Sequence, residues 1–278
     1  MVNTLLGDFR VTGLGHEQRP DWFPPGADWY QANLLQPDSL GGLKDGWFAV
    51  VHLAGNTVPG AFRDGAAVHQ NVEMTRHVLE HVETEKFLLA SSALVYAPAR
   101  TLRQETSPID PQGPYGRSKQ LCEDLARSWR ERLEIRIARP FNHIGPNMQP
   151  ALAIPSIVRR VQEAHRHPGP IEMLGQDSVR DFIDVRDVVA AYRALIELEG
   201  GEHTTFNVCT GRPSSIRTVV QAMLDALGVE REIQFAEEAV SADDTSWLVG
   251  DPSRLMSMTG WAPEFSLEQS IEDMLTDS

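Results

Sequence analysis

Short apolar runs alternate with helix-like segments along this chain, and this alternation constrains the fold more than any other feature of the sequence. The runs are rich in Val, Ile, Leu and aromatic residues, whereas the segments between them repeat apolar residues every three or four positions. Strands are expected at Phe9–Leu14, Asp28–Leu34, Trp47–Leu53, Phe87–Ser91 and Leu133–Ala138. Strands that alternate with helices in this way predict an α/β fold, a doubly wound parallel sheet with helices on both faces.

Beyond about residue 145 the pattern becomes less regular. Helices are expected at Ala151–His165, Val185–Leu198, Ser215–Leu227 and Leu267–Leu275. Asp38 and Asp184 each stand where a helix is expected to begin, and their carboxylates are placed to cap it. We therefore predict a dinucleotide-binding domain over residues 1–145, to which 179–203 return, and a smaller substrate-binding lobe over 146–278.

Composition and charge exclude several classes of partner. The chain carries 25 basic and 39 acidic residues, a formal net charge of −14, which repels phosphate backbones and anionic lipids, so neither nucleic acid nor a membrane is expected to bind. The longest apolar run, Trp47–Gly55, is shorter than the ~20 residues that span a bilayer, and the first residues lack a signal-peptide pattern, which favours a cytoplasmic location. Cys122 and Cys209 have no metal or disulfide spacing and should pack as small apolar residues.

Four segments place polar residues at strand ends or helix starts, where an open α/β sheet binds its ligands. They are LASSALVYA at 89–97, PYGRSK at 114–119, ARPFNHIGP at 138–146 and VRDFIDVRD at 179–187. Tyr115 and Lys119 are four residues apart and so share one helix face. A nearby ammonium lowers the pKa of a phenol from ~10, so this pair predicts a proton donor or acceptor, although the same spacing is common in solvated helical pairs. Ser92 would hydrogen-bond a substrate carbonyl beside Tyr115, or cap the strand end.

The ordered set HLAGN, SSALVY, YGRSK, RPFNHIGP, RDFIDVRD and FNVCTG resembles the extended short-chain dehydrogenase/reductase family, the NAD-dependent epimerases and dehydratases of nucleotide sugars. The resemblance covers nearly the whole chain. It implies a Rossmann-like sheet, NAD or NADP as cofactor, a nucleotide-sugar substrate, no metal and a homodimer. It also implies that Ser92, Tyr115 and Lys119 are the catalytic residues.

The resemblance further implies which residues bind the ligands. The cofactor-binding residues would be Asn33, Leu34, Leu53, Ala54, Gly55, Tyr115, Lys119 and Pro140. The substrate-binding residues would be Ser92, Asn142 and Arg180, with Asn142 following the strand beside the nicotinamide and Arg180 meeting the nucleotide diphosphate through its planar donors. A surface ion pair between Arg180 and Asp181 or Asp184 is the alternative for that arginine.

Within the family, RPFNHIGP followed by Ile154-Pro155-Ser156, and LVGDPSRL followed by TGWAPEFSLEQSI, most resemble the GDP-4-keto-6-deoxy-mannose reductases and the GDP-mannose dehydratases. A 4,6-dehydratase needs an extra acid and base, which the family places after the catalytic Ser or Thr. This chain has Ala93 and Leu94 there, and neither carries a proton. We therefore expect reduction of a 4-keto-6-deoxy nucleotide sugar, with hydride from the nicotinamide and a proton from Tyr115. A 4-epimerase or 4,6-dehydratase of the same family is the alternative.

Family members open with a strand and a glycine-rich turn, GxxGxxG, whose amides receive the cofactor pyrophosphate. The segment VTGLGHEQ at 11–18 offers Gly13 and Gly15 but has Gln18 in place of a third glycine. The register to HLAGN instead predicts that Met1–Gly7 is the second half of the first helix. We therefore expect roughly 15–20 N-terminal residues to be missing, with exposed apolar sheet edges as a consequence. A truncated, non-catalytic nucleotide-sugar-binding protein is the corresponding alternative.

Two further departures concern the ligands. The second strand ends at Gly15 instead of an acid, and His16 and Arg19 follow, which favours NADP over NAD. The arginine that relatives often carry shortly before the GDPS segment is replaced by Val240-Ser241-Ala242, so the nucleotide base stays open.

His77-Val78-Leu79-Glu80-His81 has the HxxEH spacing of the inverted zincins, in which two histidines bind zinc and a glutamate acts as base. Val72, Val78, Leu79 and Val82 define the apolar face of this helix, however, and both histidines fall on the opposite side. We expect the histidines to face solvent or a dimer contact.

Overall fold

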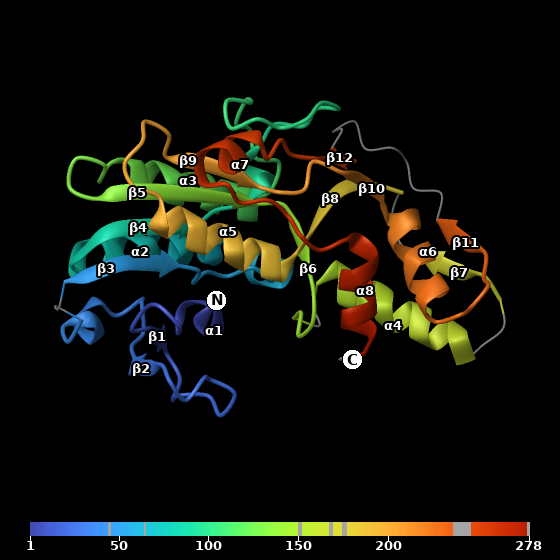
Figure 1. Ribbon diagram of the computed structural model, residues 1–278, viewed down its shortest axis with the longest axis horizontal. Coiled ribbons are helices and arrows are strands. Elements are labelled where there is room, and N and C mark those ends of the chain that lie inside the picture. The colour runs from blue at the N-terminus through green and yellow to red at the C-terminus, as the bar shows by residue number, and fades with distance from the viewer. Residues whose placement is uncertain are drawn as a thin grey trace.

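The computed structural model describes residues 1–43, 46–63, 65–149, 152–166, 169–173, 177–235 and 246–276. Its elements in chain order are α1 (Val2–Leu5), β1 (Thr12–Gly15), β2 (Asp28–Gln31), η1 (Pro37–Leu40), β3 (Trp47–His52), η2 (Pro59–Phe62), α2 (Ala66–His81), β4 (Thr84–Ala90), η3 (Ala93–Val95), α3 (Pro114–Arg127), β5 (Glu134–Pro140), β6 (Asn142–Ile144), α4 (Ala153–Arg166), β7 (Ile171–Met173), β8 (Val179–Asp184), α5 (Val185–Glu197), β9 (Thr205–Val208), β10 (Pro213–Ser215), α6 (Ile216–Ala226), β11 (Ile233–Phe235), β12 (Trp247–Leu248), α7 (Ser253–Thr259) and α8 (Leu267–Thr276). Figure 1 shows how these elements are arranged.

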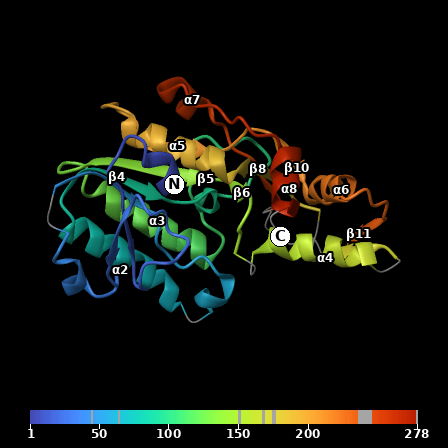
Figure 2. The same cartoon turned by 60° about the horizontal axis from the view of Figure 1, so that its bottom comes forward.

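The main sheet has the strand order β3-β4-β5-β9, and every neighbouring pair in it is parallel. Helices α2 and α3 cover one face of this sheet and α5 covers the other (Figure 2). Residues Phe87–Ala90 of β4 are buried on both faces, which explains why this part of the strand reads as a continuous apolar run and not as an alternating one. The predicted doubly wound α/β fold, which is Rossmann-like, is confirmed.

Two apolar cores hold these layers together. One core lies between the sheet and α2 and α3, and it contains Phe87, Leu89, Ile135 and Ile137. The other lies between the sheet and α5, where Leu88 and other sheet residues meet the helix. Because successive residues of a strand point to opposite faces, Leu88 and Leu89 belong to different cores.

Strands β1 and β2 form a separate parallel pair, in register from Thr12 opposite Asp28 to Gly15 opposite Gln31. Among the described residues, β1 pairs with β2 alone. A strand was expected from Phe9, but β1 begins only at Thr12. Gly13 and Gly15 lie on this strand, and a β-carbon at either would meet the aromatic rings of Phe23 or Trp29. These two glycines therefore make room for packed rings and do not form a phosphate-binding turn.

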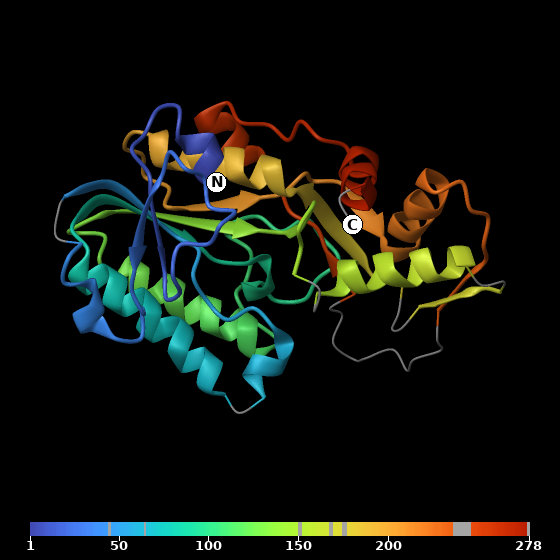
Figure 3. The ribbon, with the colours of Figure 1, turned by 90° about the horizontal axis from the view of Figure 1, so that it is seen from below.

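Helices α4, α6 and α8, with strands β6, β7, β8, β10, β11 and β12, form a second, smaller unit beside the carboxyl ends of β4 and β5 (Figure 3). Its core contains Val161, Phe182, Val219 and Ile271, from α4, β8, α6 and α8. Helices α1 and α7 pack instead in the core that contains α5. One part of the predicted division differs from the structure. Thr205–Val208 was assigned to the second lobe, yet it pairs with β5 and completes the main sheet as β9.

The two predicted helix caps have different outcomes. Asp184 caps α5, and its side chain accepts a hydrogen bond from the amide of Arg186. The prediction for Asp38 is wrong, because that residue lies inside the short 3-10 helix η1, whose first turn has no side-chain cap. Pro37 begins this helix instead, with a backbone angle already suited to it.

Candidate active site

Helix α3 presents Tyr115 and Lys119 to the segment that follows β4. Pro114 occupies its first turn, where a missing amide hydrogen costs nothing. A β-carbon at Gly116 would overlap the carbonyl oxygen of Leu94, so α3 approaches η3 closely only because residue 116 is glycine. The glycine of YGRSK therefore determines how near the helix lies to Ser92.

The side chain of Ser92 lies close enough to that of Tyr115 to lower the pKa of the phenol. Ser92 is buried at the N-terminus of η3, and its hydroxyl oxygen also accepts from the amide of Leu94 at 3.2 Å. The catalytic and capping roles considered for Ser92 are therefore compatible, because a hydroxyl can donate one hydrogen bond while it accepts others. Ser92 and Tyr115 are 23 positions apart in the sequence, and the packing of α3 on η3 brings them together.

Burial raises the pKa of Tyr115 to about 12, and the nearby Ser92 side chain opposes this change only in part. The sequence predicted the opposite shift, a pKa lowered by Lys119, and that prediction is wrong for this structure. The Lys119 ammonium lies 5.8 Å from the centre of the Tyr115 ring and donates to the carbonyl of Ala90 at 2.8 Å. Desolvation of the phenolate therefore dominates, and Tyr115 is fully protonated at neutral pH.

Lys119 is itself buried, and burial lowers the pKa of its ammonium, whereas the Glu123 carboxylate raises it. An ammonium has three donors, and Ala90 supplies the one acceptor it bonds among the described residues. A β-carbon at Gly55 would lie 3.6 Å from the Lys119 nitrogen, so the loop after β3 passes close to this group. The remaining donors suit hydroxyl groups of a ligand lying against that loop.

Glu123 and Arg139 form a buried ion pair that sequence analysis missed. Arg139 lies on β5, and its guanidinium contacts both carboxylate oxygens of Glu123 on α3, at 2.9 and 2.6 Å. The Ser91 hydroxyl donates to the same carboxylate at 2.5 Å. Two signals were present in the sequence: an arginine within an apolar strand, and a glutamate one helical turn after Lys119.

Asn71 on α2 was also missed. Its side-chain oxygen accepts from the amide of Asn56 at 2.7 Å, and its nitrogen donates to the Ser118 hydroxyl at 3.0 Å. The residue is buried and joins the loop after β3, helix α2 and helix α3. An asparagine among the apolar positions of a helix was the available signal, because a buried amide needs partners.

The predicted cofactor-binding residues fall into two groups. Leu53, Ala54 and Gly55 follow β3 at its carboxyl end, and the side chains of Leu53 and Ala54 are exposed there. Pro140 ends β5 at the same edge of the sheet as Tyr115 and Lys119.

Asn33 and Leu34 lie in the turn after β2. Asn33 accepts from the amide of Leu35 at 3.0 Å, within its own turn. Leu34 is buried in the core beneath α2, so its side chain is used for packing. Leu34 therefore has a structural role, and Asn33 bonds residues of its own turn.

NAD or NADP fits these residues at one end. Three parts of this region are open to contact with a ligand. They are the exposed loop after β3, the glycine beside Lys119 and the donors of the Lys119 ammonium that Ala90 does not use. They suit the ribose and nicotinamide end of such a cofactor. The glycine-rich turn that would receive the pyrophosphate is not formed by Gly13 and Gly15, which pack against Phe23 and Trp29.

Asn142 and Arg180 lie on neighbouring strands. Asn142 on β6 is exposed and pairs with Phe182 of β8. Arg180 lies on β8, and burial lowers the pKa of its guanidinium. The alternative ion pairs do not form, because the Asp181 carboxylate accepts from Thr210 and the Asp184 carboxylate accepts from Arg186. Among the described residues, Arg180 forms no salt bridge and so is available to an anionic ligand.

The HxxEH helix segment shows a different arrangement from the predicted one. His77 is not solvent-facing: its side chain is 14% exposed, and its Nδ1 bonds the carbonyl of Leu34 at 2.7 Å. His81 contacts the carbonyl of His77. No group of three or more candidate metal ligands occurs among the residues searched, which are the described ones.

Both cysteines are free thiols and buried, as expected. Val240-Ser241-Ala242 lie outside the described residues.

No helix in the described part of the chain is both long and apolar enough to span a membrane.

Residues 2–209 match the profile of the NAD dependent epimerase/dehydratase family. The chain is 35% identical to GDP-6-deoxy-D-mannose reductase of Pseudomonas aeruginosa, over 89% of this chain and 86% of that protein. It is 28% identical to GDP-6-deoxy-D-talose 4-dehydrogenase of Aggregatibacter actinomycetemcomitans, over 81% and 78% of the two chains.

A solved structure shows the same likeness in three dimensions. The fold superimposes on the structure of RMD from Pseudomonas aeruginosa complexed with NADPH, with a TM-score of 0.77 and 33% sequence identity. The match covers 90% of this chain and 88% of that one.

Proposed function

Because this chain belongs to the NAD dependent epimerase/dehydratase family, we propose that it reduces the keto group of a 4-keto-6-deoxy nucleotide sugar of the GDP-6-deoxy-mannose type with NAD(P)H. The observation that carries this proposal is the proximity of Ser92 to the Tyr115 phenol, whose pKa it lowers, beside a buried Lys119 that bonds the carbonyl of Ala90 at the end of β4. A protonated phenol and a serine hydroxyl that meet there are arranged to bind one carbonyl oxygen.

The residues have separate tasks in this reaction. The bound cofactor supplies the hydride that the carbonyl carbon accepts. Tyr115 donates its proton to the carbonyl oxygen, and a pKa of about 12 keeps that proton in place until the oxygen becomes basic. Ser92 holds the carbonyl oxygen within reach of the phenol. Lys119 is held by the carbonyl of Ala90, and its remaining donors hold the cofactor ribose.

Reduction is favoured over 4,6-dehydration by the residues next to Ser92. Ala93 is buried and Leu94 is 51% exposed, so the exposed position next to the serine presents an apolar side chain. The nearby carboxylates of Glu105 and Glu123 are already held by Asn207 and Arg139. No described acid beside Ser92 is therefore free to remove a proton from the sugar ring.

Two finer assignments belong to the same proposal. NADPH is the preferred cofactor, in keeping with the NADPH complex of the similar structure and with His16 and Arg19 after β1. The Arg19 guanidinium donates to the carbonyl of Pro24 at 2.7 Å, so it would have to turn to meet a phosphate. A homodimer would form through α2 and α3, where Leu121 is exposed. A cytoplasmic location stays a prediction.

The test is a direct assay of the purified chain with GDP-4-keto-6-deoxy-mannose and either NADPH or NADH. Loss of absorbance by NADPH, with formation of GDP-6-deoxy-mannose, is the expected result. Tyr115→Phe should reduce kcat by roughly 100- to 10,000-fold, the usual range for a proton donor, with an unchanged melting temperature. Tyr30→Phe on β2 is the matched control and should keep its activity.

Binding of the nucleotide sugar without consumption of either cofactor would contradict the reductase and favour the non-catalytic alternative. Release of water from GDP-mannose would instead identify a dehydratase.

A further inference from the structure

The short helix η3 carries an exposed apolar side chain beside the candidate catalytic serine. Ala93 and Val95 are buried in the apolar core that also contains Phe141. Leu94, between them, is 51% exposed and belongs to none of the apolar cores of the described residues. Single exposed leucines are common on protein surfaces, but this one follows Ser92 by two residues. It therefore lies where an apolar group of a bound ligand could cover it.

The backbone of Leu94 lies close to both Ser92 and Tyr115. Its amide nitrogen donates to the Ser92 hydroxyl oxygen at 3.2 Å. With standard backbone dimensions, the Leu94 β-carbon is then within about 6 Å of that oxygen. The carbonyl of Leu94 faces Gly116, the residue after Tyr115, so closely that a β-carbon on Gly116 would overlap it. The Leu94 side chain therefore begins next to any group that Ser92 and Tyr115 bind together.

The polar groups on either side of η3 are already bonded within the protein. The Ser91 hydroxyl donates to the carboxylate of Glu123 at 2.5 Å. The Tyr96 hydroxyl donates to the side chain of Asn207 at 2.6 Å. A ligand hydroxyl placed against Leu94 would therefore find neither of these two groups free, and leucine itself offers no hydrogen bond.

A 4-keto sugar ring differs on the two sides of its carbonyl group. On one side C3 carries a hydroxyl group, and on the other side C5 of a 6-deoxy sugar carries a methyl group, which is C6. This methyl carbon is three bonds from the carbonyl oxygen, so it lies close to whatever binds that oxygen. Contact between the methyl group and a leucine removes apolar surface of both from water, which is favourable.

We propose that Leu94 is a specificity-determining residue: its side chain covers the C6 methyl group of the sugar and selects 6-deoxy sugars over sugars with a hydroxyl group at C6. A C6 hydroxyl in that place would lose its hydrogen bonds to water without replacement. Discrimination of this kind in an apolar site is roughly 10- to 100-fold. The inference rests on the proposed function, because it places the carbonyl oxygen between Ser92 and Tyr115.

Two nucleotide sugars that differ only at C6, GDP-6-deoxy-mannose and GDP-mannose, provide the test. Both are alcohols at C4, so neither can be reduced when NADPH is present, and calorimetry measures their Kd values. We expect the unaltered chain to bind GDP-6-deoxy-mannose roughly 10- to 100-fold more tightly than GDP-mannose. Leu94→Gln keeps the size of the side chain but makes it polar. In this variant the preference should fall by roughly tenfold or more, chiefly through weaker binding of the 6-deoxy sugar.

Two further variants separate this role from a merely structural one. Leu94→Met retains an apolar side chain and should keep the preference. Met256→Gln makes the same kind of change at a comparably exposed position on α7, and it should keep the preference too. All three substitutions are at exposed positions, so the melting temperature should change little. If Leu94→Gln fails to fold, Leu94→Ala replaces it and should lose affinity for the 6-deoxy sugar alone.

An unchanged preference in Leu94→Gln would overturn the proposal. An equal loss of affinity for both sugars would also overturn it, because Leu94 would then contact a part that the two share. The same holds if the unaltered chain shows no preference or binds neither sugar.

Turnover of the 4-keto sugar distinguishes these results from failure of the proposed function. A chain that reduces the 4-keto sugar, but whose preference survives in Leu94→Gln, is a reductase in which Leu94 does not determine specificity. A chain that loses its preference in Leu94→Gln, but never consumes NADPH, retains the role of Leu94 and is not a reductase.

Discussion

The guanidinium of Arg139 on β5 binds both carboxylate oxygens of Glu123 on α3, and each side chain is almost completely buried, with 2% and 1% exposed. This ion pair lies one helical turn beyond Lys119. It therefore fixes how α3 is rotated against the sheet, and with that the direction in which Tyr115 and Lys119 point. A buried pair offsets its desolvation only while both partners are present.

Glu123→Gln should therefore destabilise the protein by about 3–5 kcal/mol, the usual result of breaking a buried ion pair from one side. Unfolding in urea measures this change. The matched control is Asp8→Asn, which removes an exposed partner of Arg193 and should have a much smaller effect. Equal losses in the two variants would show that the buried pair has no special role in holding α3.

Gly116→Ala should lower kcat by roughly 10- to 100-fold and also lower the melting temperature, because its β-carbon would push α3 away from η3 and move Tyr115 relative to Ser92. The control is Gly113→Ala, three residues earlier. A β-carbon at Gly113 meets nothing within 4 Å, and its φ of −142° suits any residue. If both alanine variants keep full activity, the close approach of helix and loop is not needed for the reaction.

Lys119→Met should abolish most of the activity and weaken cofactor binding, while the melting temperature stays the same or rises. The reason is that methionine fills a similar volume without a buried charge. Lys86→Met offers a direct comparison, because Lys86 is equally buried but donates to the carbonyls of Ile196 and Leu198 at the end of α5. That variant should lose stability and keep its kcat. Loss of activity in Lys86→Met together with full activity in Lys119→Met would show that Lys119 is not the catalytic lysine.

His52 predicts how stability depends on pH. Burial and, to a smaller extent, the Lys119 ammonium lower its pKa from 6.5 to about 3, so the folded protein holds a neutral imidazole that bonds Thr75. Between about pH 3 and pH 6.5, the imidazole of this histidine carries a proton in the unfolded chain and none in the folded chain. The stabilisation is therefore complete above about pH 6.5 and is lost as the pH falls toward 3.

The free energy of unfolding of the unaltered chain should accordingly fall, relative to that of His52→Gln, by up to about 1.4 kcal/mol per pH unit below pH 6.5. Urea unfolding of both proteins between about pH 7 and pH 5 measures the difference. A difference that stays constant over this range would contradict a neutral buried His52.

The sequence alone determined the class of fold and the place of the chemistry. Apolar runs such as Phe87–Ala90 can be stable only where both faces of a strand are covered, and their alternation with helices leaves a parallel sheet as the outcome. The spacing of Tyr115 and Lys119 follows from the pitch of a helix, which is local. The cap at Asp184 is local too, and it was predictable for the same reason.

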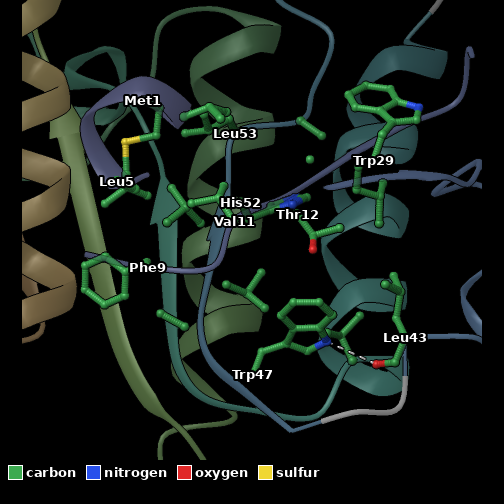
Figure 4. Close-up of a pocket in the computed structure, with 18 of the residues that line it drawn as sticks. Met1, Leu5, Phe9, Val11, Thr12, Trp29, Leu43, Trp47, His52 and Leu53 are labelled. Atoms are coloured by element: carbon green, nitrogen blue, oxygen red, sulfur yellow. Dashed lines mark hydrogen bonds between the residues drawn. The ribbon is translucent and has the colours of Figure 1, made fainter. Parts of the chain in front are cut away.

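Tertiary structure decided the properties that depend on what surrounds each group. The pKa of Tyr115 rises because burial outweighs the effect of the lysine, and spacing along a helix contains no information on burial. The partner of Glu123 is 16 positions away, on a strand that packing brings beneath the helix. The cavity lined by β1 and β3 likewise arises from the distance between two sheets (Figure 4), and such distances are set by packing among segments far apart in the chain.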